Sequence, residues 1–111
     1  MEYTNDIEIK ALNHFQNDFG EEKGLKFFNS MVKHLKEKLF SIDESIINED
    51  REDLIRHFHS LKGLLLQGGL NELSQTAKEL EARSAESVTF EEVKLEKEIK
   101  LRELIKYLRN K

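Results

Sequence analysis

The sequence predicts an all-α protein, and three observations support this expectation. The chain contains no proline, so nothing compels a helix to break in mid-run. It contains only five glycines. Apolar residues recur at steps of three and four along most of its length, which is the period of an amphipathic helix. We therefore expect an antiparallel up-down four-helix bundle with a short additional helix at its N-terminal end.

The additional helix is expected at about residues 6–19, and the bundle at about residues 21–109. Asn5 followed by Glu8 is typical of a helix N-cap with an acid at the third helical position. Gly20 is placed to end this helix in a left-handed conformation. The next helix is long and carries a single apolar stripe, formed by Phe28, Met31, Leu35, Leu39, Ile42 and Ile46.

The third and fourth helices are expected on either side of a glycine pair. Asp50 ends a polar run and is placed to cap the third helix. The buried seam of that helix is expected to be Leu54, Phe58, Leu61 and Leu65. Gly68-Gly69 then predicts a tight turn, after which a fourth helix lasts to about Ser84.

The clearest helix start lies at residues 88–93. Thr89 and Glu92 have the spacing of a capping box, and Val88 and Val93 have the spacing of a hydrophobic staple. One further helix is therefore expected from this point to the C-terminus. Its last turns are basic, and the simplest explanation is that cations suit the dipole of a helix C-terminus. These cations are Lys100, Arg102, Lys106, Arg109 and Lys111.

Length and composition narrow the class of protein. A chain of 111 residues suits a single domain, 1–111, with one core. A net charge of −4 argues against nucleic acid as a partner. The absence of cysteine removes disulfides and thiol nucleophiles. Residues 1–6 lack the pattern of a signal peptide and no stretch is apolar enough to span a membrane, so a cytoplasmic protein without a membrane partner is expected. A monomer is expected, because one bundle of this length can bury its own apolar stripes.

The four histidines do not have the spacing of a metal site. His14 and His34 each stand alone on an amphipathic helix, where a structural role is the ordinary explanation. His57 and His59 are two residues apart and point in different directions on one helix. No histidine lies three residues after a glutamate, as it does in di-iron bundles. No metal is therefore expected.

His59 has surroundings that suit chemistry. At about 100° per residue, it lies roughly 130° from the centre of the buried seam and should face solvent. Lys62 and Gly63 share its side of the helix, with Ile55 and Leu66 as apolar flankers. A neutral imidazole is a nucleophile, Lys62 offers a cation to an anionic group, and Gly63 would allow close approach of a partner. A lone exposed histidine beside a lysine is also common on helices without any such role.

The segment His59-Ser60-Leu61-Lys62-Gly63 resembles the signature of histidine-containing phosphotransfer domains. The resemblance continues through Gly69 and covers about residues 20–108; its downstream positions are Leu73, Ala77, Leu80 and Glu81. It implies that His59 accepts a phosphoryl group and exchanges it with an aspartate of a response-regulator receiver domain. It also implies that Lys62 stabilises the phosphoryl charge and that Gly63 admits the partner. No cofactor is implied, because the Mg²⁺ belongs to the receiver.

The partners that the resemblance implies are a receiver domain, a hybrid histidine kinase, or both. Ile55, Arg56, Leu66 and Gln67 are the residues expected to contact them. The chain differs from the family pattern in two places. Leu64, Leu65 and Leu66 stand where small residues are usual, and Gly68 stands where an apolar residue is usual. These differences bear on partner identity and on the rate of transfer.

Besides a phosphohistidine carrier without autonomous turnover, the sequence has two alternative interpretations. The first alternative is a passive helical module that binds receiver or kinase domains and transfers nothing, which the crowding expected from Leu66 would favour. The second is an enzyme. The sequence shows no glycine-rich phosphate loop, no metal cluster and no paired carboxylates beside a nucleophile, and so argues against it.

Overall fold

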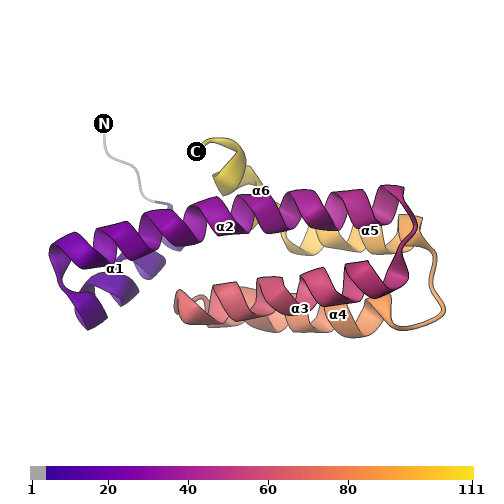
Figure 1. Cartoon of the computed structure of the whole chain (residues 1–111), viewed down its shortest axis with the longest axis horizontal. Coiled ribbons are helices and arrows are strands. Elements are labelled where there is room, and N and C mark those ends of the chain that lie inside the picture. The colour runs from indigo at the N-terminus through magenta and orange to yellow at the C-terminus, as the bar shows by residue number, and fades with distance from the viewer. Residues whose placement is uncertain (1–4) are drawn as a thin grey trace.

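A computed structural model describes residues 5–111, and within this range the chain is helical without any strand. The predicted all-α class is therefore confirmed (Figure 1). Residues 1–4 lie outside the described range. They are part of the segment predicted to lack a signal peptide and of the predicted domain 1–111. The helices are α1 (Asp6–Phe19), α2 (Glu21–Ile47), α3 (Arg51–Gln67), α4 (Asn71–Ser84), α5 (Phe90–Lys100) and α6 (Arg102–Arg109).

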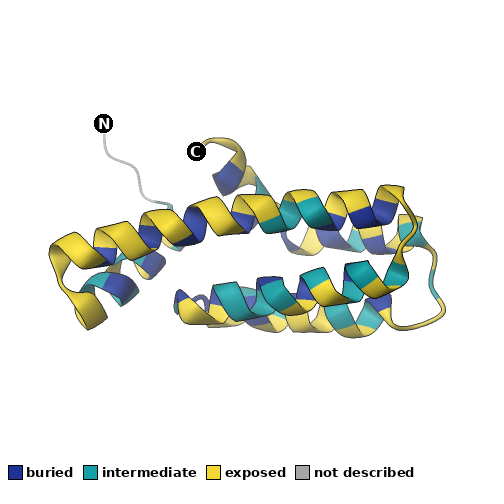
Figure 2. Ribbon diagram, viewed as in Figure 1, coloured by how far each residue is buried: buried dark blue, intermediate teal, exposed yellow. Residues whose placement is uncertain are grey.

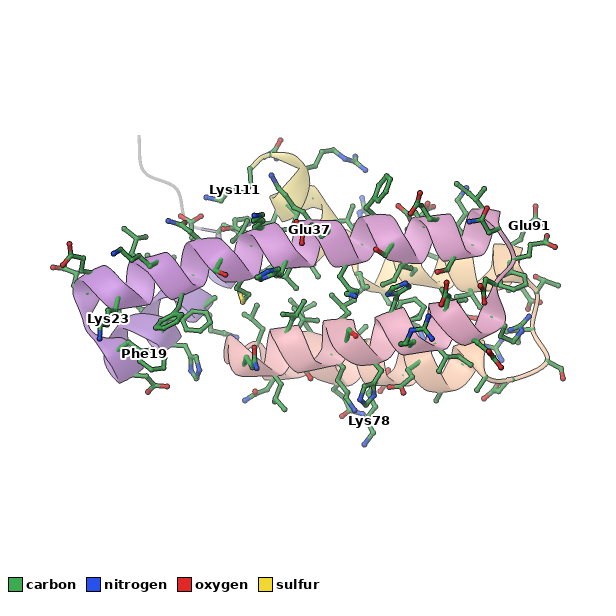
Figure 3. All side chains as sticks on the ribbon, viewed as in Figure 1. Phe19, Lys23, Glu37, Lys78, Glu91 and Lys111 are labelled. Atoms are coloured by element: carbon green, nitrogen blue, oxygen red, sulfur yellow. The ribbon has the colours of Figure 1, made fainter. Side chains whose placement is uncertain are left out.

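Four of these helices close a ring. α2 packs on α3, α3 on α4, α4 on α5, and α5 returns to α2, while α1 lies along α2. The Ser74 hydroxyl of α4 donates a 3.0 Å hydrogen bond to the Lys62 carbonyl of α3. Glu81, further along α4, faces His59, which comes earlier in α3. These two pairs show that α3 and α4 run antiparallel. Figure 3 places Phe19 and Lys23 at one end of the long axis and Glu91 at the other.

The core occupies the inside of the ring. All four residues of the predicted α3 seam are inaccessible to solvent. The α2 stripe is buried as well, apart from Leu39, which is half-buried. Figure 2 shows the same division, with buried segments on the sides of helices that face each other and exposed ones outside. None of the described helices is both long enough and apolar enough to cross a bilayer.

The predicted helix caps are present. Asn5 Oδ1 accepts hydrogen bonds from the backbone N–H groups of Ile7 at 2.9 Å and Glu8 at 3.2 Å. Asp50 Oδ1 accepts one from the N–H of Asp53 at 3.1 Å. Thr89 and Glu92 form the expected reciprocal capping box. Each cap satisfies backbone donors that the first turn of a helix leaves without a partner, and so defines where the helix begins.

The prediction of one unbroken helix after residue 89 is wrong. Leu101, with φ −105° and ψ 20°, separates α5 from α6. Figure 1 shows α6 turning away from the line of α5. The physical reason is packing, because the bend brings α6, with its buried residues Leu104, Tyr107 and Leu108, against α2. The Tyr107 hydroxyl then donates a 2.7 Å hydrogen bond to Glu8 of α1.

The N-terminal helix has the bounds that the sequence predicts. α1 spans Asp6–Phe19, and its 14 residues equal the length of α4. Phe19 belongs to the apolar repeat of this helix, yet it is 48% exposed. Its ring packs against Phe27 of α2 at an angle of 51°, with centroids 4.6 Å apart. Of the α1 side chains, Ala11 and Phe15 are buried.

The backbone conformation and the packing of the turn between α3 and α4 explain its two glycines. Gly69 has φ +75°, a left-handed conformation that side chains rarely adopt. A Cβ at Gly69 would also lie 2.7 Å from the His14 ring of α1. A Cβ at Gly68 would overlap the Met31 sulfur of α2. The turn is therefore pressed against two other helices, which accounts for Gly68 where the family pattern has a larger residue.

Candidate functional site

The fold directs His59 away from the core. α3 buries Leu54, Phe58, Leu61 and Leu65 completely, so its register is fixed against the other helices. In that register His59 faces outward, and its side chain is 62% exposed. The outward direction predicted from helical geometry is thus the one found. Leu61, within the same signature, points into the core.

Among residues 5–111, the His59 ring has one hydrogen-bond partner, Glu81 on α4. His59 Nδ1 lies 3.2 Å from Glu81 Oε2 and 3.4 Å from Oε1, and the Glu81 side chain is 24% exposed. A carboxylate accepts only, so this contact selects the neutral tautomer with its proton on Nδ1. In the neutral ring the lone pair is then on Nε2, the nitrogen that does not contact Glu81, where it is available to an incoming electrophile.

Sequence reasoning did not assign a role to Glu81. The residue was part of the downstream family pattern, but its position beside His59 depends on how α4 pairs with α3. A partner 22 residues away in sequence follows only from that antiparallel pairing. The Ser74 hydrogen bond to the Lys62 carbonyl joins the same two helices.

Lys62 and Gly63 lie one turn beyond His59. Lys62 is half-buried, and within residues 5–111 its ammonium group forms no ion pair. A Cβ built on Gly63 would meet no atom of residues 5–111 within 4 Å. The helix backbone at Gly63 is therefore open to an approaching molecule, and no contact within this range explains the glycine.

A groove of about 510 Å³ runs between α2 and α3 beside this open backbone. Gly63, Leu64 and Gln67 line it from α3, and Lys38 lines it from α2. Lys38 Nζ donates to His57 Nδ1 over 3.2 Å. Burial, and then the nearby charges of Lys38 and Arg56, lower the pKa of His57 below its ordinary value of 6.5. His57 is thus a neutral structural link between the two helices at pH 7.

The four residues predicted to contact a partner differ in how far they are exposed. Leu66 is 57% exposed, which is high for an apolar side chain. Gln67 is exposed at the groove, and Ile55 is half-buried. Arg56 is exposed and forms an ion pair with Asp53 one turn earlier. In residues 5–111 no three histidine, aspartate or glutamate side chains gather in a way that could hold a metal ion.

The family model of the Hpt domain matches residues 26–111, which is most of the chain and includes the whole of α3. The chain belongs to the Hpt domain family. Hpt domains take part in histidine phosphotransfer in phosphorelays, generally as carriers, and interact with receiver domains and kinases. The match begins inside α2, so α1 lies outside the part of this Hpt protein that the family model matches. No curated protein and no solved structure matches the chain.

Proposed function

We propose that this Hpt protein accepts a phosphoryl group on His59 and exchanges it with an aspartate of a response-regulator receiver domain. The observation that carries the proposal is the exposed imidazole of His59, held at Nδ1 by Glu81 at 3.2 Å within the Hpt signature. We also infer that the ring of α2 to α5 is the up-down bundle of the family, and that the protein acts as a cytoplasmic monomer.

The transfer step follows from the geometry of the ring. The Nε2 lone pair of His59 attacks the phosphorus of the receiver's aspartyl phosphate. As the new N–P bond forms, the P–O bond to the aspartate breaks and its electron pair stays on the aspartate carboxylate. Glu81 balances the positive charge that develops on the imidazole. Return of the phosphoryl group to an aspartate is the reverse of the same step.

Two neighbours assist without forming bonds to phosphorus. The ammonium of Lys62, which has no internal carboxylate partner among the described residues, neutralises charge on the phosphoryl oxygens. Gly63 lets the receiver approach the backbone of α3, because no atom fills the space where a Cβ would stand. The Mg²⁺ that assists transfer belongs to the receiver, and we assign no metal to this chain.

The docking surface that we propose is formed by Ile55, Arg56, Leu66 and Gln67. Its apolar members, Ile55 and Leu66, lie on either side of His59 along the helix and would form a collar around the reacting nitrogen. A receiver or kinase with apolar residues around its own active site is the matching partner. Leu66 also supports the alternative function, a module that docks on the same partners without transfer, because its large exposed side chain lies two turns beyond the histidine on the same helix and could obstruct a receiver.

The test of the proposal is direct transfer. The protein is incubated with several phosphorylated receiver domains, and intact mass spectrometry follows the appearance of a phosphoryl adduct. We expect an adduct that is labile to acid, and we expect none with His59→Gln. His57→Gln is the matched control, because His57 lies nearby but bonds to Lys38 in the groove and not to Glu81. It should still accept the group.

Two outcomes would decide against the proposal. A wild-type protein that binds receivers but stays unmodified would identify the passive module. An adduct that persists in His59→Gln would place the acceptor elsewhere.

A further inference from the structure

A second surface lies where α6 bends away from α5. The bend leaves a cavity of about 630 Å³ bordered by α2, α5 and α6, which we name the α5–α6 notch. The residues that matter to the inference are Leu39 of α2, Lys97 of α5, and Arg102, Ile105, Lys106 and Arg109 of α6. No residue of α3 or α4 lines it. The notch is therefore separate from the surface around His59.

Three of these residues form a strip of positive charge. Arg102, Lys106 and Arg109 are exposed, and none of them forms an ion pair with any residue of the described range 5–111. Spacings of four and three residues place them on one face of the helix, spread over about 10 Å of its axis. By contrast, the Lys97 ammonium is already paired with Asp43.

The helix dipole does not explain the whole strip. Lys106 and Arg109 lie in the last turn of α6, where cations suit the dipole. Arg102, however, is the first residue of α6, where the dipole disfavours a cation. The last turn of α5 already carries Lys97 and Lys100. The sequence-based explanation of these cations assumed one continuous helix, and the break at Leu101 removes that assumption for Arg102.

The notch also presents apolar surface next to the cations. Leu39 and Ile105 are half-buried. They pack against the core and also line the notch. Asp43, Glu98 and Glu103 border it too, so its charge is mixed. Asp43 is paired with Lys97, which leaves three unpaired cations beside Glu98 and Glu103. In a chain of net charge −4 this is a local reversal of sign. Such a surface would bind an anionic group that also has an apolar side.

We propose that the α5–α6 notch binds an acidic amphipathic helix of a partner protein. A small anion such as phosphate would reach one or two of the cations, because the strip extends over about 10 Å. A helix with carboxylates at positions i, i+4 and i+7 matches all three cations, and its adjacent apolar face meets Leu39 and Ile105. This partner leaves the exposed face of α3 free, so the inference does not depend on the function proposed for His59.

The experiment uses a synthetic helical peptide with glutamates at i, i+4 and i+7 and leucines on the neighbouring face. Its binding to the whole chain is measured by fluorescence anisotropy at low salt, and the methyl signals of Leu39 and Ile105 are followed by NMR. We expect saturable binding, shifts at both methyl groups, and an affinity about tenfold lower in the triple variant R102Q/K106Q/R109Q. A peptide with glutamine in place of each glutamate should bind the wild-type chain about as weakly as the glutamate peptide binds the triple variant.

The matched control is K23Q/K26Q/K33Q, which removes the same charge from exposed positions of α2. It should keep the wild-type affinity. The inference is wrong if the peptide does not bind, if both triple variants weaken binding equally, or if inorganic phosphate displaces the peptide at matching concentrations. Concentration-dependent self-association that disappears in R102Q/K106Q/R109Q would assign the notch to a second copy of the chain, and would also overturn it.

Discussion

His59 and Glu81 illustrate what a sequence conveys about a single side chain. The outward direction of His59 followed from the positions of Leu54, Phe58, Leu61 and Leu65, because a helix has a fixed angle per residue. The contact with Glu81 did not follow, since it requires the register between two helices. The same limit applies to Lys38 and His57, which meet across α2 and α3. Directions of these side chains were predictable, and their partners on another helix were not.

The Glu81 contact predicts a graded effect on transfer. Glu81→Gln keeps the size of the side chain and one acceptor but removes the charge that faces His59 Nδ1. We expect phosphoryl transfer to slow roughly 2- to 10-fold, because the neutral acceptor that remains forms a weaker hydrogen bond than the carboxylate does. The ¹⁵N chemical shifts of His59 should also show a smaller fraction of the tautomer protonated at Nδ1.

Glu79→Gln is the control for this prediction, because Glu79 lies on the same helix, is exposed and forms no ion pair among the described residues. It should leave both measurements unchanged. If Glu81→Gln matches the wild type in rate and in tautomer, the carboxylate does not position the ring.

At the scale of helices, the ends were predicted better than the interiors. Asn5, Asp50 and Thr89 all cap helices as expected, because capping depends on residues three or four apart. The break at Leu101 was not predicted. No proline or glycine marks it, and the apolar spacing continues through it. The position of the break depends on how α6 packs against α2, and the local sequence does not specify this packing.

The glycines of α3 and its turn give a prediction at this scale. Gly63→Gln should stabilise the fold by about 0.5–1 kcal/mol, because glycine is a poor helix former and a Cβ here meets nothing within 4 Å. The same variant should slow transfer by obstructing the partner. Denaturant unfolding and the transfer assay measure the two effects separately.

Gly68→Ala should have the opposite effects, a less stable fold and little change in transfer. Its Cβ would overlap the Met31 sulfur, so overpacking should cost about 1 kcal/mol or more. Its transfer rate should change little while the protein stays folded. Unchanged transfer in Gly63→Gln would show that the open backbone at Gly63 has no role in docking.

On the scale of the whole molecule, helices from the two ends of the chain are joined through Glu8. The Tyr107 hydroxyl and the Lys111 ammonium both approach Glu8 Oε1, at 2.7 and 2.6 Å. α1 also covers the turn between α3 and α4 through His14, and contributes Phe15 to the core. α1 is therefore integrated into the fold even though the family match begins at residue 26.

Glu8 gives the fold a dependence on pH. The hydrogen bonds from Lys111 and then from Tyr107 lower the pKa of Glu8 below its ordinary value of 4.5. At a pH between the pKa of Glu8 in the folded state and its pKa in the unfolded state, the folded state thus binds fewer protons than the unfolded state. The stabilisation is complete above about pH 4.5 and is lost as the pH falls through the folded pKa. Glu8→Gln should lower the free energy of unfolding by about 1 kcal/mol at neutral pH.

The measurement is denaturant unfolding of the wild type and Glu8→Gln at pH 7 and again at about pH 3, where the difference between them should shrink. Glu22→Gln, an exposed residue without an ion pair among the described residues, is the control. A difference that stays constant with pH would mean that the contacts of Glu8 stabilise the fold through packing and not through its charge.

The placement of His59 and Glu81 on two packed helices has a consequence for the thermodynamics of docking. Side chains on rigid elements have little conformational freedom to lose when a partner arrives. Most of the ordering cost in an encounter would then fall on the partner's loops. A carrier of this kind would release a spent partner and meet a fresh one without refolding any part of itself, so its exchange between partners would be limited by diffusion and fit.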